Sequence, residues 1–534
     1  MNEPTFFPVI DGLRESASHT PDAIAILGNA PVTYKELHAS ACCIAARVQA
    51  EGIAPGARLA IWLRKGNHAV SAIWGALEAG LAYVPLDPGQ PGERAMRILQ
   101  EAQPEVLVIT PDLLSHLPGA LPDSVKLVLL SGAGTCDNNP QLPVPADWIS
   151  DLPPTKHLPF DATPDAIAAV LFTSGSTGTP KGVQMSCRNL ATFIGWAIEE
   201  LGLGQDDVFA NHASFHFDLS TFDLFAAAHV GASVWLVPTP DQSNIIAIAD
   251  GLKKHAVTTI YAVPSILTML TRAGQLSPEM LPSLRRVLFA GEVFPIQSLR
   301  KLITQVSDKC DLYNFYGPTE TNVCTYYKVR QEDVYRDTSV PIGQPLPGQT
   351  ALVIDPKTDQ PIANGIKGEL VIEGSLVTPG YLNPPNDRIR KAHASGRHPT
   401  GDVVSREDDV LVYHGRTDRI VKIQGNRVEL GEIEAALLHH KQVRQSVVVP
   451  LQSPRGAELV AFVACDTDEN KPGALDLLNE LREYLPRYML PKHVKIMPAL
   501  PRTSNGKTDF VHLKRIAEDS LIHPDLSPRE GVPL

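Results

Sequence analysis

The sequence lacks the features that would place the protein on nucleic acid or in a membrane. Its 534 residues include 47 Lys and Arg against 59 Asp and Glu, so the formal net charge is -12. Because neutralising a phosphate backbone needs a basic surface, a general nucleic-acid binder is excluded. No apolar run reaches the about 18 residues that span a bilayer, and the first residues lack the basic and apolar regions of a signal peptide. We therefore expect a cytoplasmic protein that binds neither nucleic acid nor membrane.

The sequence also lacks a cysteine framework. Its seven cysteines are odd in number and scattered, with no CxxC pair and no histidine at metal-ligand spacing. This pattern excludes a disulfide-stapled secreted domain and a zinc site, and it suits a reducing compartment.

A Walker loop, GxxxxGK followed by Ser or Thr, is absent as well, which disfavours a P-loop kinase or ATPase. The nearest stretch is TSGSTGTPKG, residues 173–182, in which Lys181 lies between Pro180 and Gly182. Its glycines allow positive φ and close backbone approach, and its hydroxyls can donate hydrogen bonds. The stretch can therefore form an anion cradle, and the alternative is a flexible surface turn.

Helical and strand-like runs alternate in the first part of the chain. Residues 34–52 and 69–80 have helical spacing, and residues 57–63 read as a strand between them. Such alternation predicts parallel sheets covered by helices. A strand at 166–172 precedes the glycine loop and helical spacing starts at Ser186, so we expect the loop to join a strand to a helix.

The later part of the chain has a different pattern of predicted strands and helices. Runs at 258–264, 285–291 and 311–317 are β-rich, and 368–374 with 411–416 suggests an antiparallel, hairpin-rich portion. Beyond Asp418 we expect a helix at 430–442, strands at 446–451 and 458–465, and a helix at 474–485. The predicted fold class is α/β. A large N-terminal domain of residues 1–417 combines helix-flanked sheets with a β-rich, barrel-like portion, and residues 418–534 form a small α+β domain.

Several motifs resemble one known family. LFTSGSTGTPKGV resembles the phosphate loop of the adenylate-forming enzymes, which include acyl-CoA synthetases, luciferases and the adenylation domains of nonribosomal peptide synthetases. Further motifs follow in the family's order across nearly the whole chain. They are VTYKEL (32–37), LEAGLAYVPLDP (77–88), FHFDLSTFDLF (215–225), NFYGPTET (314–321), GELVIEGSLVTPGYL (368–382), TGD (400–402), GRTDRIVKIQGNRVELGEIE (415–434) and NGK (505–507).

The resemblance implies that the protein activates a carboxylate with ATP, releases pyrophosphate, forms an acyl-adenylate and passes the acyl group to a thiol. Attack of a carboxylate on a phosphate brings two anions together, so the site must supply cations and dipoles where charge develops. The resemblance assigns the β- and γ-phosphates of ATP to Thr173, Ser174, Ser176, Thr177 and Lys181. It assigns Mg²⁺ to Glu320, an oxygen ligand of the kind this ion prefers.

The same resemblance places the rest of the nucleotide. Tyr316 would stack on adenine with Asn314 beside it, Asp402 would accept from both ribose hydroxyls, and Arg416 would support the ribose. The stretch RHPTGD, residues 397–402, departs from the family before its TGD, so we assign no role to Arg397 or His398.

The small domain carries a further set of implied roles. Lys507 would bridge the substrate carboxylate and the phosphate, which makes it a catalytic residue together with Thr173 and Glu320. Asp418 matches the hinge about which the small domain moves, although a plain interdomain ion pair is the alternative for this residue. Gly425 and Arg427 would line the path of the thiol.

The resemblance also indicates the acid. Asp218 matches the residue that amino-acid-activating members pair with the substrate ammonium, and acyl-CoA ligases generally lack it. The implied pocket is otherwise apolar, and its residues are Asp218, Leu219, Phe222, Tyr261, Leu288, Ala290, Phe315, Val323, Cys324 and Lys507. For each apolar member, ordinary core packing is the alternative. A charged substrate side chain would find no partner there, and burying one unpaired is costly.

We therefore expect a small neutral amino acid. The pocket set resembles that of free-standing L-prolyl ligases, which load proline onto a carrier protein, although Phe222 and Phe315 stand where aliphatic residues are expected. L-proline is our first choice, and alanine or D-alanine comes next. A rival enzyme reading, an acyl-CoA-type ligase, is disfavoured by Asp218. An inactive homologue is disfavoured because Lys507, Glu320 and the loop are all present.

No serine motif of a carrier domain follows Lys507. We therefore expect the thiol acceptor to be the phosphopantetheine arm of a separate peptidyl carrier protein.

One prediction concerns Lys507. An ammonium between two anions lowers the repulsion of the first half-reaction, so Lys507→Ala should reduce adenylate formation at least about a hundredfold and slow thiol transfer much less. Pyrophosphate exchange measures the first step, and transfer from supplied acyl-adenylate measures the second. Equal losses in both steps would contradict the assigned role.

Overall fold

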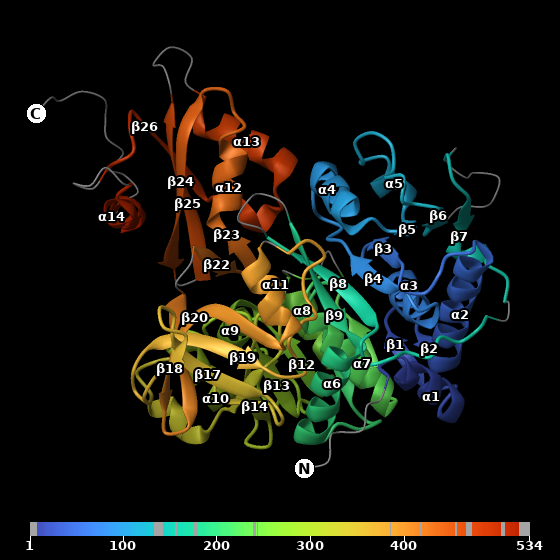
Figure 1. The fold of residues 1–534 in the computed structure, drawn as a ribbon. Helices are drawn as coiled ribbons and strands as arrows, with labels where there is room; N and C mark the ends of the chain where they lie inside the picture. Colours follow the sequence, from blue (N-terminus) through green and yellow to red (C-terminus); the bar gives the residue numbers. More distant parts are fainter. Residues whose placement is uncertain are drawn as a thin grey trace, which may run out of the picture. The chain divides into compact units, whose positions relative to one another are not determined.

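The computed structural model describes most of the chain, namely residues 8–132, 142–154, 157–174, 180–238, 242, 244–384, 386–416, 419–453, 456–465, 472–502 and 508–522 (Figure 1). The chain divides into two compact units. The first comprises Met1–Pro88, Ala95–Phe172 and Lys181–Asp418, and the second comprises Gly89–Arg94, Thr173–Pro180 and Arg419–Leu534. Asp418 itself lies outside the described residues, so its role as a hinge stays a prediction.

The first unit contains a nine-stranded sheet in the order β16-β15-β14-β13-β12-β10-β11-β1-β2. Its central strands β14, β13, β12, β10, β11 and β1 run parallel, and β2, β15 and β16 are antiparallel to their neighbours. The strands are β1 (Ile24–Leu27), β2 (Val32–Thr33), β10 (Val208–Asn211), β11 (Ser233–Leu236), β12 (Thr259–Ala262), β13 (Arg286–Phe289), β14 (Asp311–Tyr316), β15 (Thr325–Lys328) and β16 (Gln344–Pro345).

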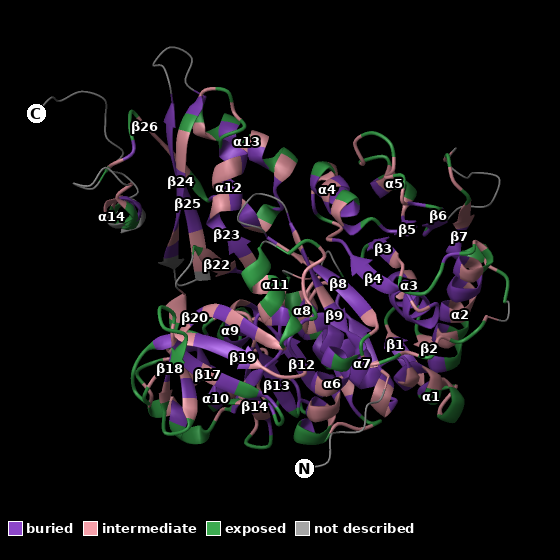
Figure 2. Cartoon of the chain, viewed as in Figure 1, coloured by how far each residue is buried: buried purple, intermediate pink, exposed green. Residues whose placement is uncertain are grey.

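A second sheet of this unit has seven strands in the order β7-β6-β5-β3-β4-β8-β9. They are β3 (Arg58–Trp62), β4 (Ala82–Pro85), β5 (Val106–Ile109), β6 (Leu127–Leu130), β7 (Ala146–Trp148), β8 (Ile167–Thr173) and β9 (Lys181–Ser186). Strands β3 to β6 are buried along nearly their whole length, as near-continuous apolar runs in a covered parallel sheet should be. Figure 2 shows these strands largely in the colour of buried residues.

The β-rich portion forms a third sheet of five strands in the order β18-β17-β19-β20-β21, all antiparallel. They are β17 (Thr350–Asp355), β18 (Gln360–Pro361), β19 (Gly368–Glu373), β20 (Arg397–Glu407) and β21 (Val410–Arg416). The predicted antiparallel portion is confirmed. The α/β class, with parallel sheets in a large domain, is confirmed as well.

Helices cover the two large sheets. They are α1 (Asp11–His19), α2 (Tyr34–Ala50), α3 (Asn67–Glu78), α4 (Gly92–Ala102), α5 (Pro111–Leu114), α6 (Cys187–Leu201), α7 (Leu219–Val230), α8 (Ile245–Lys254), α9 (Pro264–Arg272) and α10 (Ile296–Gln305). Helix α11 (Asp387–Ala394) packs on β20 of the five-stranded sheet. Among the residues with a described structure, no helix is long and apolar enough to cross a bilayer.

Helix α6 matters most for the site, and local sequence sets both its ends. Ser186 caps the first turn by accepting from the Asn189 backbone, and the Asn189 side chain accepts from the Ser186 backbone in return. Gly202 ends the helix in the left-handed region at φ 56°. Between these ends, Leu190, Phe193, Ile194 and Ala197 are buried on one face of the helix, and Ile198 on the same face is partly buried.

One prediction about the glycine loop was wrong. The loop joins strand β8 to strand β9, and helix α6 starts only after β9. Residues 181–186 extend because Val183 and Met185 are both buried and alternate with the half-buried Gln184 along the strand. The helix predicted from Ser186 onward is confirmed, but the short strand before it was not predicted.

The second unit contains a hairpin and a three-stranded sheet. The elements are β22 (Ile420–Ile423), β23 (Asn426–Glu429), α12 (Leu430–Leu437), β24 (Val443–Ser453), β25 (Gly456–Cys465), α13 (Ala474–Tyr484), β26 (His493–Met497) and α14 (Phe510–Ile522). The sheet order is β24-β25-β26. Helix α12 is shorter than predicted, because the backbone N–H groups of His439 and His440 bond three residues back and form a turn before β24.

A buried carboxylate ties together the first helices of the first unit. Glu78, at the end of α3, accepts from Arg14 Nη2 at 2.7 Å and lies 3.3 Å from His38 Nε2 and 3.1 Å from His157 Nε2. A hydrogen bond with Cys42, followed by one with Glu78, raises the pKa of His38 to about 9.

This shift predicts a pH dependence of stability. Since the pKa of His38 is raised in the folded state, its contribution is complete below an unfolded pKa of about 6.5 and is lost as pH rises through about 9. In urea denaturation, the wild type should exceed His38→Gln in unfolding free energy at about pH 6 and lose most of that excess by about pH 9.5. An excess that is constant over this range would show that the pKa of His38 is the same in the folded and unfolded states.

Candidate active site

The candidate site lies at one edge of the nine-stranded sheet. Strands β10, β12, β13 and β14 are parallel, so their carboxyl ends share this edge. Ligands of open α/β sheets bind beyond the carboxyl ends of the strands. The segments that carry the predicted site residues leave these ends, since Asp218 follows β10, Ala290 follows β13 and Glu320 follows β14.

The predicted pocket residues gather on one face of the sheet. Tyr261 of β12 is in register with Leu288 of β13, and Phe315 lies two residues along β14 from Tyr313, which pairs with Leu288. Alternate residues of a strand point to opposite faces, and these residues belong to one apolar core while Ile260, Val287 and Phe289 belong to another. The other predicted members in the same core are Phe222, Ala290, Val323, Cys324 and, at its margin, Leu219.

Asp218 stands at the start of α7, where its backbone carbonyl accepts from Thr221. Its side chain is near Tyr261, because burial first and then the charges of Asp218 and Asp223 raise the pKa of that phenol well above its usual range. The structure therefore places the Asp218 carboxylate near Tyr261, a member of this apolar cluster.

Asp402 organises the predicted nucleotide site. One of its carboxylate oxygens accepts from Tyr316 Oη at 2.5 Å and the other from Arg416 Nη1 at 2.8 Å. Asp402 and Arg416 are in register across β20 and β21, whereas Tyr316 ends β14. All three belong to the first unit, so this set joins the five-stranded sheet to the nine-stranded sheet.

The Tyr316 hydroxyl adds to what the sequence predicted. Burial and the neighbouring Asp402 raise the pKa of Tyr316 well above its usual range, so the phenol stays a donor. The Tyr316 ring was predicted to stack on adenine, and the hydrogen bond from its hydroxyl to Asp402 orients this ring. Asn314, two residues earlier on the same face of β14, donates to the carbonyl of Pro341 at 2.8 Å.

Glu320 is buried, with 1% of its surface exposed. One carboxylate oxygen accepts from Tyr381 Oη at 2.5 Å, which orients the group. Tyr381 was not predicted as a site residue, although it lies in the quoted motif GELVIEGSLVTPGYL. Within the described part of the chain, no group of three or more His, Cys, Asp and Glu side chains could hold a metal ion.

The predicted phosphate loop is described only at its ends. Thr173 ends β8 and Lys181 starts β9, while Ser176 and Thr177 lie outside the described residues. Within the second unit, the Ser174 hydroxyl donates to the carbonyl of Arg427 at 2.7 Å and accepts from the N–H of Glu429 at 3.0 Å. In this conformation, the Ser174 hydroxyl bonds to strand β23.

The remaining predicted residues lie at or beyond the end of the first unit. Lys507 and Asp418 lie outside the described residues. Gly425 forms the turn between β22 and β23 at φ 80°, a conformation that favours glycine, and Arg427 is on β23 opposite Lys422.

Sequence reasoning missed two buried titratable residues beside the segment that leads to Asp218. Lys65 Nζ donates to the carbonyls of Asn211 and His212, each at 2.8 Å, and desolvation lowers its pKa to about 7. Burial raises the pKa of Asp223, which accepts from Asn211 Nδ2 at 3.0 Å, well above its usual range. Asp223 is the one acidic residue of the apolar helix α7. A single acidic residue in an apolar helix could have indicated a buried carboxylate from the sequence.

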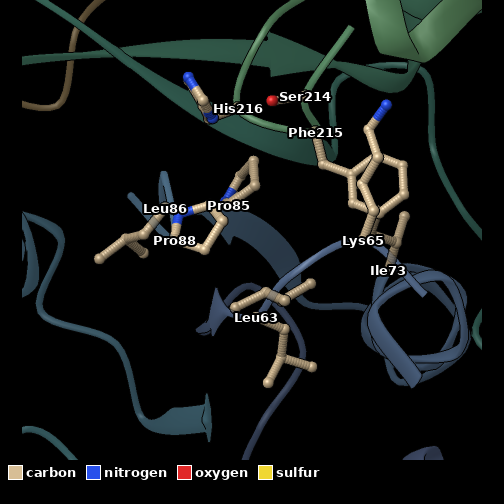
Figure 3. Close-up of a pocket in the computed structure, with 10 residues that line it drawn as sticks. Leu63, Lys65, Ile73, Pro85, Leu86, Pro88, Ser214, Phe215 and His216 are labelled. Atoms are coloured by element: carbon tan, nitrogen blue, oxygen red, sulfur yellow. The ribbon is translucent and has the colours of Figure 1, made fainter. Parts of the chain in front are cut away.

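A pocket lies beside Lys65. Figure 3 shows the Lys65 side chain next to the ring of Phe215, and its ammonium is 5.8 Å from the ring centre. Phe215 belongs to the segment that leads to Asp218, and Lys65 bonds to the carbonyl of His212 in that segment. The other lining residues are Ile61, Leu63, Ile73, Pro85, Leu86, Pro88, Ser214 and His216.

Comparison with known proteins decides the family. The model of the AMP-binding enzymes matches residues 13–382, and the model of the AMP-binding enzyme C-terminal domain matches residues 432–507. The chain belongs to the AMP-binding enzyme family. Use of ATP follows from this membership.

Two relatives of this AMP-binding enzyme match over nearly their whole length. One is the L-proline--[L-prolyl-carrier protein] ligase of Streptomyces coelicolor, 44% identical over 98% of this chain and 97% of the relative. The other carries the same name in Pseudomonas fluorescens and is 36% identical over 91% of this chain and 94% of the relative. The solved adenylation domain AlmE of Vibrio cholerae shares the fold with a TM-score of 0.81, 24% identity, and coverage of 97% of this chain and 99% of that structure.

The Tyr316–Asp402 bond gives a prediction for nucleotide binding. Tyr316→Phe keeps the ring but removes the hydroxyl that orients Asp402, so the KM for ATP should rise about three- to tenfold, the net worth of one such bond. The matched control is Tyr313→Phe on the same strand, whose hydroxyl bonds to Glu200 on the other face. Steady-state kinetics should show an unchanged KM for ATP in the control. A rise of equal size in both variants would contradict a role of the Asp402 bond.

Proposed function

We propose that this enzyme activates L-proline with ATP as prolyl-adenylate, releases pyrophosphate and transfers the prolyl group to the phosphopantetheine thiol of a separate carrier protein. The observation that carries the proposal is the full-length similarity, at 44% identity, to a ligase named for L-proline and its carrier protein. The single carboxylate at an apolar pocket supports it independently.

The pocket suits the two parts of proline. Asp218 pairs with the ammonium of the amino acid, and the fully buried side chains of Phe222, Leu288 and Cys324 surround the apolar ring. A charged or strongly polar side chain would lose its hydration there without gaining a partner, which costs several kcal/mol, roughly 2–7. At the other end of the substrate, Lys507 neutralises the carboxylate as it approaches the α-phosphorus.

The nucleotide is held by residues at the ends of β14 and β21 and in the middle of β20. Asp402 accepts from the two ribose hydroxyls, and Arg416 orients that carboxylate by its own bond to it. Tyr316 stacks on the adenine, and Asn314 lies on the same face of its strand. Thr173, Ser174, Ser176, Thr177 and Lys181 receive the β- and γ-phosphates.

Mg²⁺ fits the chemistry of Glu320. The ion takes oxygen ligands, often one or two carboxylates with the remainder supplied by phosphates and water. Glu320 is a buried carboxylate with one oxygen bound by Tyr381, and no larger acidic cluster stands in the described residues. When bound, the ion would neutralise phosphate charge, and the protein's part is to hold this one carboxylate in place.

Thiol transfer needs a second arrangement of the small domain. We assign the hinge between residues 1–417 and 418–534 to Asp418. Gly425 and Arg427, on the hairpin of β22 and β23, then line the approach of the phosphopantetheine arm. The glycine lets the turn come close to a neighbouring chain, since a side chain there would be strained at φ 80°.

Pyrophosphate exchange across the proteinogenic amino acids tests the proposal. Proline should give the highest exchange rate, and alanine and D-alanine should give a much lower one. The variant Asp218→Ala should lower the rate with proline at least about a hundredfold, because the ion pair with the substrate ammonium is lost. The control is Asp165→Ala, an acidic residue whose side chain is 86% exposed and pairs with Arg188. No exchange with proline by the wild type would overturn the assignment of the substrate.

A further inference from the structure

Four aromatic rings form a closed circuit behind the candidate pocket. Phe222 packs against Tyr261 with ring centres 5.6 Å apart, and Tyr261 packs against Phe315 at 5.6 Å. Phe193 of α6 completes the circuit, since its ring centre is 6.1 Å from Phe222 and 6.5 Å from Phe315. Each of these distances lies in the range of favourable aromatic pairs.

Three members of the circuit belong to the predicted pocket, and Phe193 does not. All four rings are buried, with at most 1% of any side chain's residue surface exposed. The Phe193–Phe222 contact is tilted and the other three contacts are edge-to-face, and rings packed in this way leave no room for a ligand between them. The circuit therefore forms a packed floor of the predicted pocket, and a substrate cannot lie between its rings.

Helix α6 braces this floor from behind. Trp196 lies one turn after Phe193 on the same side of the helix, and its ring centre is 5.5 Å from Phe315 and 4.7 Å from Tyr326. Tyr326 is also the cross-strand partner of Phe315. Phe315 is thus held between Tyr261 on one side and α6 on the other, which leaves its ring no alternative position without movement of Phe193 or Trp196.

We propose that Phe193 is a positioning residue for substrate specificity. Its ring keeps the rings of Phe222 and Phe315 in their packed positions, and the pocket therefore admits a substrate ring no larger than that of proline. The inference rests on the proposed function, because it concerns the depth of the same pocket. Phe193 acts through its two neighbours and does not touch the substrate.

The test replaces Phe193 by leucine. The smaller side chain gives Phe222 and Phe315 space to tilt into, so the floor deepens. Pipecolate, the six-membered homologue of proline, should then gain relative to proline. One methylene in an apolar pocket is worth about 10- to 200-fold in kcat/KM, so the pipecolate to proline ratio should rise at least about tenfold. For proline itself, KM should rise while kcat changes little, because its ring is held less firmly.

A matched control separates this effect from general loosening of the core. Phe289→Leu makes the same change at a fully buried site on the same sheet, but on the opposite face and in the other core. Its substrate ratio should stay within about twofold of the wild type, since no methylene-sized change reaches the pocket. Thermal unfolding of both variants establishes that they are folded.

Trp196→Phe is the second variant and serves where Phe193→Leu does not fold. It keeps an aromatic ring but withdraws part of the brace behind Phe315, so the ratio should move in the same direction by a smaller factor. An unchanged ratio in a folded Phe193→Leu variant, or an equal rise in Phe289→Leu, would overturn the inference.

The wild-type measurement keeps the two proposals distinct. If the wild type does not exchange pyrophosphate with proline, the proposed function fails. The size limit is then tested with the amino acid that the wild type prefers and the homologue longer by one methylene, where the same shift on Phe193→Leu is expected and its absence rejects the role of Phe193.

Discussion

The alternation of side chains along β12, β13 and β14 is the constraint on which the site depends. Because neighbouring residues of a strand point to opposite faces, Tyr261, Leu288 and Phe315 line the candidate pocket, while Ile260, Val287 and Phe289 pack under α9 and α10. A slip of one residue in any strand would exchange the pocket for the core. The parallel register therefore determines which side chains line the pocket, and it also contributes to the stability of the sheet.

The same sheet edge also gathers the nucleotide residues. Tyr316 ends β14 one residue beyond Phe315, and its hydroxyl reaches Asp402 on a different sheet. Asp402 in turn holds Arg416 from the neighbouring strand. A single buried carboxylate thus fixes the distance between the predicted amino-acid pocket and the predicted ribose position, as in-line attack on a phosphate requires.

Much of this arrangement could be predicted from the sequence, and the misses have physical reasons. The strands at 258–264, 285–291 and 311–317 were found because buried parallel strands are continuous apolar runs. Strand β9 was missed because it has only six residues between a glycine loop and a helix. Its alternation of buried and half-buried side chains is too short to be recognised in the sequence. The circuit through Phe193 could not be predicted, since helical spacing says which face is buried but not which distant rings meet there. Within the predicted site, Ser174 was expected to face phosphate, yet its hydroxyl bonds to β23, a partner that no local pattern indicates.

The central claim is that one apolar pocket with one carboxylate selects a prolyl-adenylate. Titration calorimetry with the stable analogue prolyl-sulfamoyl-adenosine, compared with its phenylalanyl counterpart, tests it most directly. The account predicts that the prolyl analogue binds at least about a hundredfold more tightly, a difference of about 2.7 kcal/mol. Equal affinity for the two analogues, or tighter binding of the phenylalanyl one, would contradict it.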